Sequence, residues 1–400
     1  MSDEGAIGFV LALGRALHRY GTPAHRLEEG LRTCCDRLGL EAEVFTTPTA
    51  IIMSFGRPTE LRTRMLRVDG GELDMGKLTQ LDDLADRVAA HAIDPAEGVI
   101  QLDAIVAGPR QYGRVLGTAT QAVSSAAFAV FFGGGLADVI TAGAIGLLIG
   151  LLAQFVRRST DQARVLELIA AAFASLAAGI ASSVWSSITP SLVTVAALVL
   201  LLPGMSLTVA MTELATRNLI AGTARLMAAV IVLLQLVVGV ALGERLASAL
   251  VAVHQAVPVA LPEWTLWVAL AAASIGVAIA VQAQLHSLGW IIAACVTGYL
   301  GSRAGAAWLG GPMGVMVGAF ALGILSNAYA RWLGRPAQVV QVPAVLLLVP
   351  GSMGFRGMSS LLDKDTLTGV ETLFAMFVVS IAIVAGLLIA NAVVSPRRSL

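Results

Sequence analysis

Charged residues are scarce in this chain of 400 residues. Lys, Arg, Asp and Glu together make up 13% of it, whereas a soluble domain carries roughly 25%, and 57% of the residues are hydrophobic. Basic and acidic residues number 26 each, so the net charge of zero favours neither nucleic acid nor a polyanion as a partner. The composition therefore predicts a protein whose main partner is the lipid bilayer.

Cysteine is also rare, with three residues in the whole chain. Adjacent Cys34 and Cys35 lack the spacing of a zinc site, and Cys295 lies in an apolar segment, so we expect buried thiols and no metal ligands. His18 and His25 flank a Gly-Thr-Pro break in the helical pattern, which argues against a shared metal ion.

The sequence lacks the short motifs of several enzyme classes. HExxH, GxSxG, the Walker P-loop and the GxGxxG fingerprint are missing, so no catalytic residue, metal or cofactor is predicted. Without an ATP-binding motif, any uphill transport must use an ion gradient.

The charges that are present cluster near the start of the chain. Of the 26 Asp and Glu residues, 17 precede Gln111, which predicts a polar α+β domain over residues 1–110. We expect helices over residues 7–20, 24–38, 75–91 and 95–106, and strands over residues 43–55 and 61–68. Thr22 is the expected cap of the second helix, with Pro23 at its first position. No apolar run follows the acidic start at signal-peptide distance, so no cleaved signal is expected.

Apolar runs dominate the rest of the chain, and each approaches the ~20 residues that span a bilayer. The first set covers residues 115–132, 137–156, 165–185, 190–211 and 223–242. The second set covers residues 266–283, 287–301, 312–330, 338–358 and 370–393. We therefore predict a polytopic α-helical membrane protein with about ten transmembrane helices, in two five-helix units over residues 111–250 and 251–400.

Two of these runs are interrupted by the same dipeptide, Pro203-Gly204 in one and Pro350-Gly351 in the other. Such a pair removes a backbone donor and loosens the helix where hydrocarbon offers no other partner. The difference between the two proline positions, 350 − 203 = 147, is called the repeat offset. The same offset aligns a Phe, a Trp and a basic residue, namely Phe173 with Phe320, Trp185 with Trp332, and Arg217 with Lys364. We infer an internal repeat, and because five spans is an odd number, the two units must cross the membrane in opposite directions.

The basic residues after the first domain predict the orientation in the membrane. Eleven fall on the side of the N-terminal domain: Arg110, Arg114, Arg157, Arg158, Arg164, Arg217, Arg225, Arg331, Arg335, Arg397 and Arg398. Four fall on the other side: Arg245, Arg303, Arg356 and Lys364. This asymmetry predicts that both termini lie in the cytoplasm.

The two breaks are the predicted substrate site. Half-helices that begin at Gly204 and Gly351 would present free amides and a positive dipole end, which suit a carboxylate. Nearby hydroxyls would orient a small polar ligand. The predicted substrate-binding residues are Pro203, Gly204, Ser206, Thr208, Pro350, Gly351 and Ser352. A pair of proline kinks without function is the alternative, and the matched positions favour binding.

Ionisable residues inside a membrane are costly, so Glu213, Arg217, Arg225 and Arg356 are candidates for a functional role. Glu213 and Arg217 are four positions apart and could pair along one helical face. Alternatively, Glu213 is a proton-responsive group that couples transport to a proton gradient.

Several segments together resemble the threonine/serine exporter family. They are Leu13–Leu17, Tyr20–Leu27, Leu38–Leu40, Val44–Pro48, Leu202–Gly204, Thr208, Glu213–Leu214, Ala221–Gly222, Arg225–Leu226, Val349–Ser352 and Arg356–Gly357. The resemblance covers nearly the whole chain. It implies a bacterial inner-membrane exporter with about ten spans, driven by the proton gradient, which moves threonine and serine.

Two other functions are compatible with the sequence. A dicarboxylate of the succinate type would fit anion-binding half-helices equally well, and related two-protein systems are linked to dicarboxylate export. A membrane-anchored enzyme with its active site in the N-terminal domain is the other alternative, although that domain shows no nucleophile–base pair. A homo-oligomer is compatible with this fold class.

Overall fold

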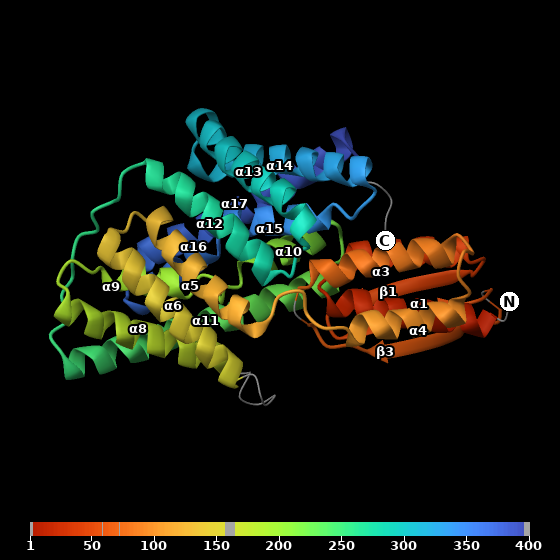
Figure 1. The fold of residues 1–400 in the computed structure, drawn as a ribbon, viewed down its shortest axis with the longest axis horizontal. Helices are drawn as coiled ribbons and strands as arrows, with labels where there is room; N and C mark the ends of the chain where they lie inside the picture. Colours follow the sequence, from red (N-terminus) through yellow and green to blue (C-terminus); the bar gives the residue numbers. More distant parts are fainter. Residues whose placement is uncertain (1–2, 58, 72, 157–164, 396–400) are drawn as a thin grey trace.

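The computed structural model describes residues 3–57, 59–71, 73–156 and 165–395. Five arginines of the orientation argument, Arg157, Arg158, Arg164, Arg397 and Arg398, lie outside the described residues. The chain folds into an N-terminal α+β unit and a larger part made of helices, which lie side by side in Figure 1.

The N-terminal unit holds four helices and one sheet. In chain order these are α1 (Asp3–Arg19), α2 (Ala24–Arg37), β1 (Ala42–Thr47), β2 (Ala50–Phe55), β3 (Arg62–Arg67), α3 (Met75–Ala89) and α4 (Pro95–Ala107). The sheet is antiparallel in the order β1-β2-β3, and Phe45, Ile52 and Met65 stand side by side across it. Its inner face packs on the helices through Ile51 and Met53, which are fully buried.

Two local expectations for this unit are wrong. The strand predicted over residues 43–55 is a hairpin, because a turn at Pro48 and Thr49 separates β1 from β2, and the Thr47 hydroxyl accepts a hydrogen bond from the Ala50 amide at 3.0 Å. Thr22 does not cap α2, since Pro23 holds the cap position with extended backbone angles and no side-chain cap bond forms. The acceptor for the Ala24 amide comes from another part of the chain.

The helical part begins after Tyr112. Its first half contains α5 (Arg114–Phe131), α6 (Leu136–Val156), α8 (Leu166–Val184), α9 (Pro190–Ala197), α10 (Gly204–Ala215) and α11 (Leu219–Leu250). Its second half contains α12 (Trp264–Ala280), the 3-10 turn η1 (Leu285–Ser287), α13 (Leu288–Leu309), α14 (Gly311–Leu333), α15 (Gln338–Leu348), α16 (Gly351–Leu362) and α17 (Thr366–Val393). Among the described residues, seven helical segments are long and apolar enough to cross a membrane: α6, α8, α11, η1 with α13, α14, the α15–α16 pair and α17.

Both Pro-Gly dipeptides interrupt helices. α9 ends at Ala197 and α10 starts at Gly204, while α15 ends at Leu348 and α16 starts at Gly351. The prolines before the second pieces have nearly the same backbone angles, φ −79° and ψ 36° at Pro203, φ −82° and ψ 30° at Pro350. The predicted breaks are therefore present.

The segments after the breaks have the same geometry at positions related by the repeat offset. α10 and α16 start at Gly204 and Gly351 and end at Ala215 and Leu362, so the offset relates both their starts and their ends. Each is followed by a tight turn in which a basic residue, Arg217 or Lys364, adopts φ 66°. The contacts of two glycines repeat as well. A methyl group on Gly222 would meet Leu214, and one on Gly369 would meet Leu361.

Helix packing follows the same correspondence. α8 packs on α11 as α14 packs on α17, and α10 packs on α11 as α16 packs on α17. The halves also contact each other reciprocally, because α10 touches α17 and α16 touches α11. Gly239 of α11 lies against the backbone of α8, and its counterpart at the repeat offset, Gly386 of α17, lies against the backbone of α14.

Candidate functional site

The two helix breaks meet at the contact between the halves. A methyl group placed on Gly351 would lie 3.1 Å from the Cα of Gly204, and one placed on Gly204 would lie 3.3 Å from the Cα of Gly351. The contacts with flanking residues are also reciprocal. A methyl group on Gly204 would meet Val349, and one on Gly351 would meet Leu202, which is the counterpart of Val349 at the repeat offset. The two glycines are buried, so the N-terminal ends of α10 and α16 face one another inside the protein.

Each facing end carries backbone N–H groups that have no backbone acceptor within the described part of the chain. Within α10 the first amide that bonds back is that of Leu207, to the Pro203 carbonyl at 3.0 Å, and within α16 it is that of Gly354, to the Pro350 carbonyl at 3.0 Å. The amides before them belong to the first turn, where an α-helix leaves its N–H groups without an intrahelical acceptor. The positive ends of two helix dipoles therefore point to one place, which favours a bound anion.

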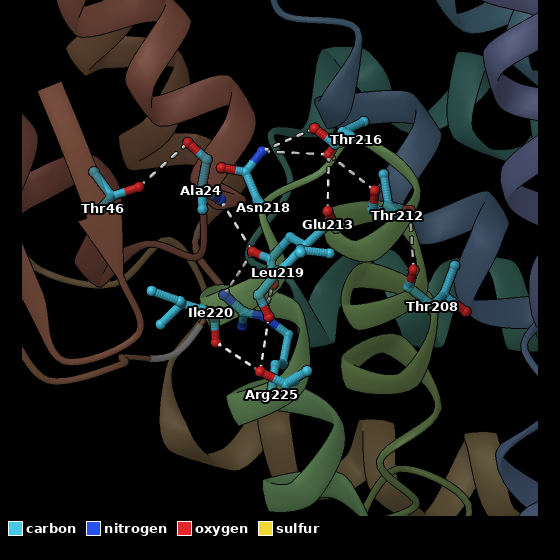
Figure 2. Close-up of polar contacts among 11 residues, drawn as sticks. Ala24, Thr46, Thr208, Thr212, Glu213, Thr216, Asn218, Leu219, Ile220 and Arg225 are labelled. Atoms are coloured by element: carbon cyan, nitrogen blue, oxygen red, sulfur yellow. Dashed lines mark hydrogen bonds and ion pairs between the residues drawn. The ribbon is translucent and has the colours of Figure 1, made fainter.

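Hydroxyl groups lie in the first two turns of α10 and in the first turn of α16. Thr208 is 2% exposed, and its Oγ1 has no hydrogen-bond partner among the described residues, although its carbonyl accepts a bond from the Thr212 hydroxyl (Figure 2). A buried hydroxyl without a partner is costly, so this one is a candidate ligand contact. Ser206 and Ser352 are partly buried on the same turns as the free amides.

Glu213 lies at the other end of α10 and is fully buried. Its Oε2 accepts from Nε of Arg225 at 3.0 Å, and its Oε1 accepts from Nη2 of Arg225 at 3.1 Å. Its Oε1 also accepts from the Ala24 amide at 3.1 Å, so the carboxylate caps α2 of the N-terminal unit (Figure 2). The carboxylate that sequence placed in the membrane part thus holds two parts of the molecule together.

The pairing of Glu213 with Arg217 is a prediction that the structure does not support. α10 ends at Ala215, and the chain turns at Arg217 with a left-handed backbone, so the sequence spacing does not place both side chains on one helical face. The guanidinium that reaches Glu213 is that of Arg225, from the second turn of α11.

Arg356 is the basic residue that follows the second break most closely. It lies in the second turn of α16, and its guanidinium sits 4.9 Å from the ring centroid of Phe132 at the end of α5. This cation–π contact links the two halves.

Polar residues of α5 form a part of this region that the sequence interpretation missed. Gln121 and Ser125 both donate to the carbonyl of Ala197, the last residue of α9, at 3.2 and 3.3 Å. They satisfy a carbonyl that the broken helix leaves free. Thr120 and Ser124 are buried on the same helix, and their hydroxyls have no partner in the described part of the chain. The signal in the sequence was the helical spacing of Thr, Gln and Ser within an apolar run.

Comparisons with known proteins identify the family of the chain. Residues 8–247 match the family model described as a putative threonine/serine exporter, and residues 264–393 match a second one described as threonine/serine exporter, ThrE. The chain belongs to the threonine/serine exporter family. This confirms the resemblance seen in the sequence, and the family description points to transport rather than to an enzyme.

The chain is similar to curated proteins of yeasts. The pheromone-regulated membrane protein 10 of Saccharomyces cerevisiae is 29% identical over 89% of this chain and 47% of its own length. An uncharacterized protein of Schizosaccharomyces pombe is 29% identical over 87% of this chain and 48% of its own length. The chain thus spans less than half the length of these relatives. No solved structure matches the chain.

Proposed function

We propose that this protein is a secondary transporter that exports small hydroxylated amino acids, with threonine and serine as its substrates. The observation that carries the proposal is the contact of Gly204 with Gly351, which brings two helix N-termini together inside the protein. Broken helices at a contact between halves are the usual position of a substrate site in secondary transporters.

The chemistry of the site suits an amino acid. The free amides of the first turns of α10 and α16 would hold the substrate carboxylate, because no buried cation is needed where two dipole ends converge. The hydroxyls of Ser206, Thr208 and Ser352 would orient the polar side chain of the substrate. Thr208 supports this assignment most directly, since its hydroxyl is buried without a partner in the described residues.

The proposed architecture is two inverted five-helix repeats of residues 111–250 and 251–400, after a domain of residues 1–110. Supporting it are the shared repeat offset, the matching turns at Arg217 and Lys364, and the reciprocal contacts of the halves. In this proposal α5, α12 and the α9–α10 pair join the seven long segments, which makes ten spans (7 + 3).

The proposed membrane is a bacterial inner membrane, with both termini in the cytoplasm. The distribution of basic residues in the sequence supports this orientation. Transport would be driven by the proton gradient, with Glu213 as the coupling group. Protonation of Glu213 would remove the negative charge that its two hydrogen bonds with Arg225 rely on and would place a proton on one of the two accepting oxygens, so proton uptake and a rearrangement around α10 would be linked.

Counterflow in proteoliposomes tests the function. Vesicles loaded with unlabelled threonine should accumulate labelled threonine and serine, and the G351L variant should not, because its side chain would fill the contact with Gly204. Unchanged counterflow in G351L would argue against the site. Absence of counterflow with every amino acid in wild-type vesicles would argue against amino-acid transport itself.

Dicarboxylate export is the second candidate, and the facing helix ends favour it specifically. Two dipole ends at one place could each hold one carboxylate of a succinate-type molecule. The same vesicles, loaded with succinate in place of threonine, separate the two substrates.

A further inference from the structure

The N-terminal unit is bonded to the second half of the helical part through the start of α3. Asp74 caps this helix by accepting from the Lys77 amide at 2.8 Å. Two other amides at the start of α3 donate to carbonyls of the second half. The Met75 amide donates to the Val281 carbonyl at 2.9 Å, and the Gly76 amide donates to the Gln282 carbonyl at 3.1 Å. The start of α3 and the end of α12 thus satisfy each other's free backbone groups.

Side chains strengthen the same contact. Met75 and Leu78 are buried in one apolar cluster with Val277 and Ile291 of the second half. Tyr112, in the segment after α4, donates its amide to the Gln282 side chain at 2.9 Å and its hydroxyl to the Ala283 carbonyl at 2.8 Å. Backbone hydrogen bonds and a shared apolar cluster therefore join the N-terminal unit to the second half.

The contact with the first half is smaller. Among the described residues it includes the hydrogen bond from the Ala24 amide to Glu213, and β1 lies against α11. Glu213 is held for this bond by Arg225. At the repeat offset, the positions of Glu213 and Arg225 are taken by Ser360 and Thr372, so the equivalent end of the second half lacks this ion pair.

We propose that the N-terminal unit is the inner gate of the transporter. It moves with the second half, and it latches onto the first half through the Ala24–Glu213 hydrogen bond, which opens when the inner side opens. The inference rests on the proposed function, because a carrier with two halves must move one against the other. It gives the N-terminal unit a role that requires no ligand of its own.

A single substitution at Ala24 can remove the hydrogen bond to Glu213 that forms the latch. Ala24 is the first residue of α2, where proline is tolerated, and Pro23 before it already has the extended backbone that a following proline requires. The A24P variant removes the amide hydrogen that Glu213 accepts and leaves α2 able to form. The matched control is A24G, which keeps this N–H. E213Q weakens the same bond from the other side and serves for the distance measurement alone if A24P fails to fold, because Glu213 is also the proposed coupling group.

Distances between spin labels on the full-length protein report the motion. The native cysteines do not compete for label, because Cys34, Cys35 and Cys295 are at most 1% exposed. One label goes on exposed Met65 of β3. The second goes on Leu219 of the first half in one sample and on Leu285 of the second half in the other, and both positions are exposed.

In A24P, the distribution of Met65–Leu219 distances should become broader and its mean longer, while the Met65–Leu285 distances stay unchanged. In A24G, both distances should match those of the wild type. Counterflow of threonine should change about tenfold between A24P and A24G, the size expected for one hydrogen bond to a charged group. Unchanged distances, or equal changes in both, would overturn the latch, and moved distances with unaltered counterflow would overturn the gate. Missing counterflow in the wild type would instead count against the proposed function, while the distances still test the latch.

Discussion

Gly204 and Gly351 pack backbone against backbone, although they lie in different halves of the chain. Each is the first residue of a helix that follows a proline, and each contacts the residue that precedes the other's proline. A contact that is the same from either side has local two-fold character. It places the first turns of two helices at one point between the halves.

Side chains at this contact should not be tolerated. A methyl group on Gly204 would collide with Val349, and one on Gly351 would press on the Gly204 backbone at 3.1 Å. We expect G204A and G351A each to cost about 1–3 kcal/mol of stability and most of the counterflow. Melting temperatures in detergent and vesicle counterflow measure the two effects. G117A is the control, since a methyl group there meets nothing within 4 Å, and a comparable loss in G117A would contradict the steric explanation.

The hydroxyl of Thr208 should matter for transport more than for folding. It is buried and unpartnered within the described residues, so T208V keeps the shape and should leave the melting temperature equal or slightly higher. If this hydroxyl orients the substrate, counterflow of threonine falls about tenfold. T212V, one turn later, removes a hydroxyl that bonds to the Thr208 carbonyl and should leave counterflow near wild type. Equal counterflow in T208V and wild type would remove Thr208 from the site.

The Glu213–Arg225 pair should be a large contributor to stability. Arg225 lies beside a carboxylate that is fully buried, so R225M would leave that charge without its partner and cost about 3–5 kcal/mol. R217M is the control because Arg217 is exposed after its tight turn, and it should cost less than about 0.5 kcal/mol. Thermal unfolding of both variants in the same detergent decides the matter, and similar losses would point to Arg217 as a second partner.

Local chemistry made much of this structure predictable. Proline removes a helix hydrogen bond and the glycine after it weakens the helix further, and the breaks predicted at Pro203 and Pro350 are present. The hairpin turn at Pro48 was missed because β-branched threonines on both sides of it extend the strand pattern.

Contacts between residues far apart in the chain could not be predicted from a single sequence. Arg217 is the charged residue nearest to Glu213 in the sequence, but the chain turns at Arg217 with a left-handed backbone. The ion pair with Glu213 is formed by Arg225 instead. The bond from Ala24 to Glu213 joins positions 189 residues apart, and no spacing rule reports such a contact. The same holds for Gln121 and Ser125, whose acceptor is the end of another helix.

Lowering the pH should destabilise α2 and the residues around it, because His25 takes up a proton more readily in the unfolded chain. Burial and the neighbouring Arg26 lower the pKa of His25 to about 4, whereas the unfolded chain has the ordinary value near 6.5. Between these two values the unfolded state binds a proton that the folded state does not, so the free energy of unfolding falls as the pH drops from about 6.5 to 4. Burial also lowers the pKa of His18, which acts in the same direction.

Hydrogen exchange of α2 in the full-length protein measures this effect, after correction for the intrinsic pH dependence of exchange. Protection of residues 24–37 should decrease between pH 7 and pH 5 in the wild type, and less steeply in H25Q, which has no proton to take up. H91Q is the control, because His91 is exposed and its loss should leave the pH profile of α2 unchanged. An identical slope in H25Q and wild type would mean that His25 does not carry the pH dependence, and would direct attention to His18.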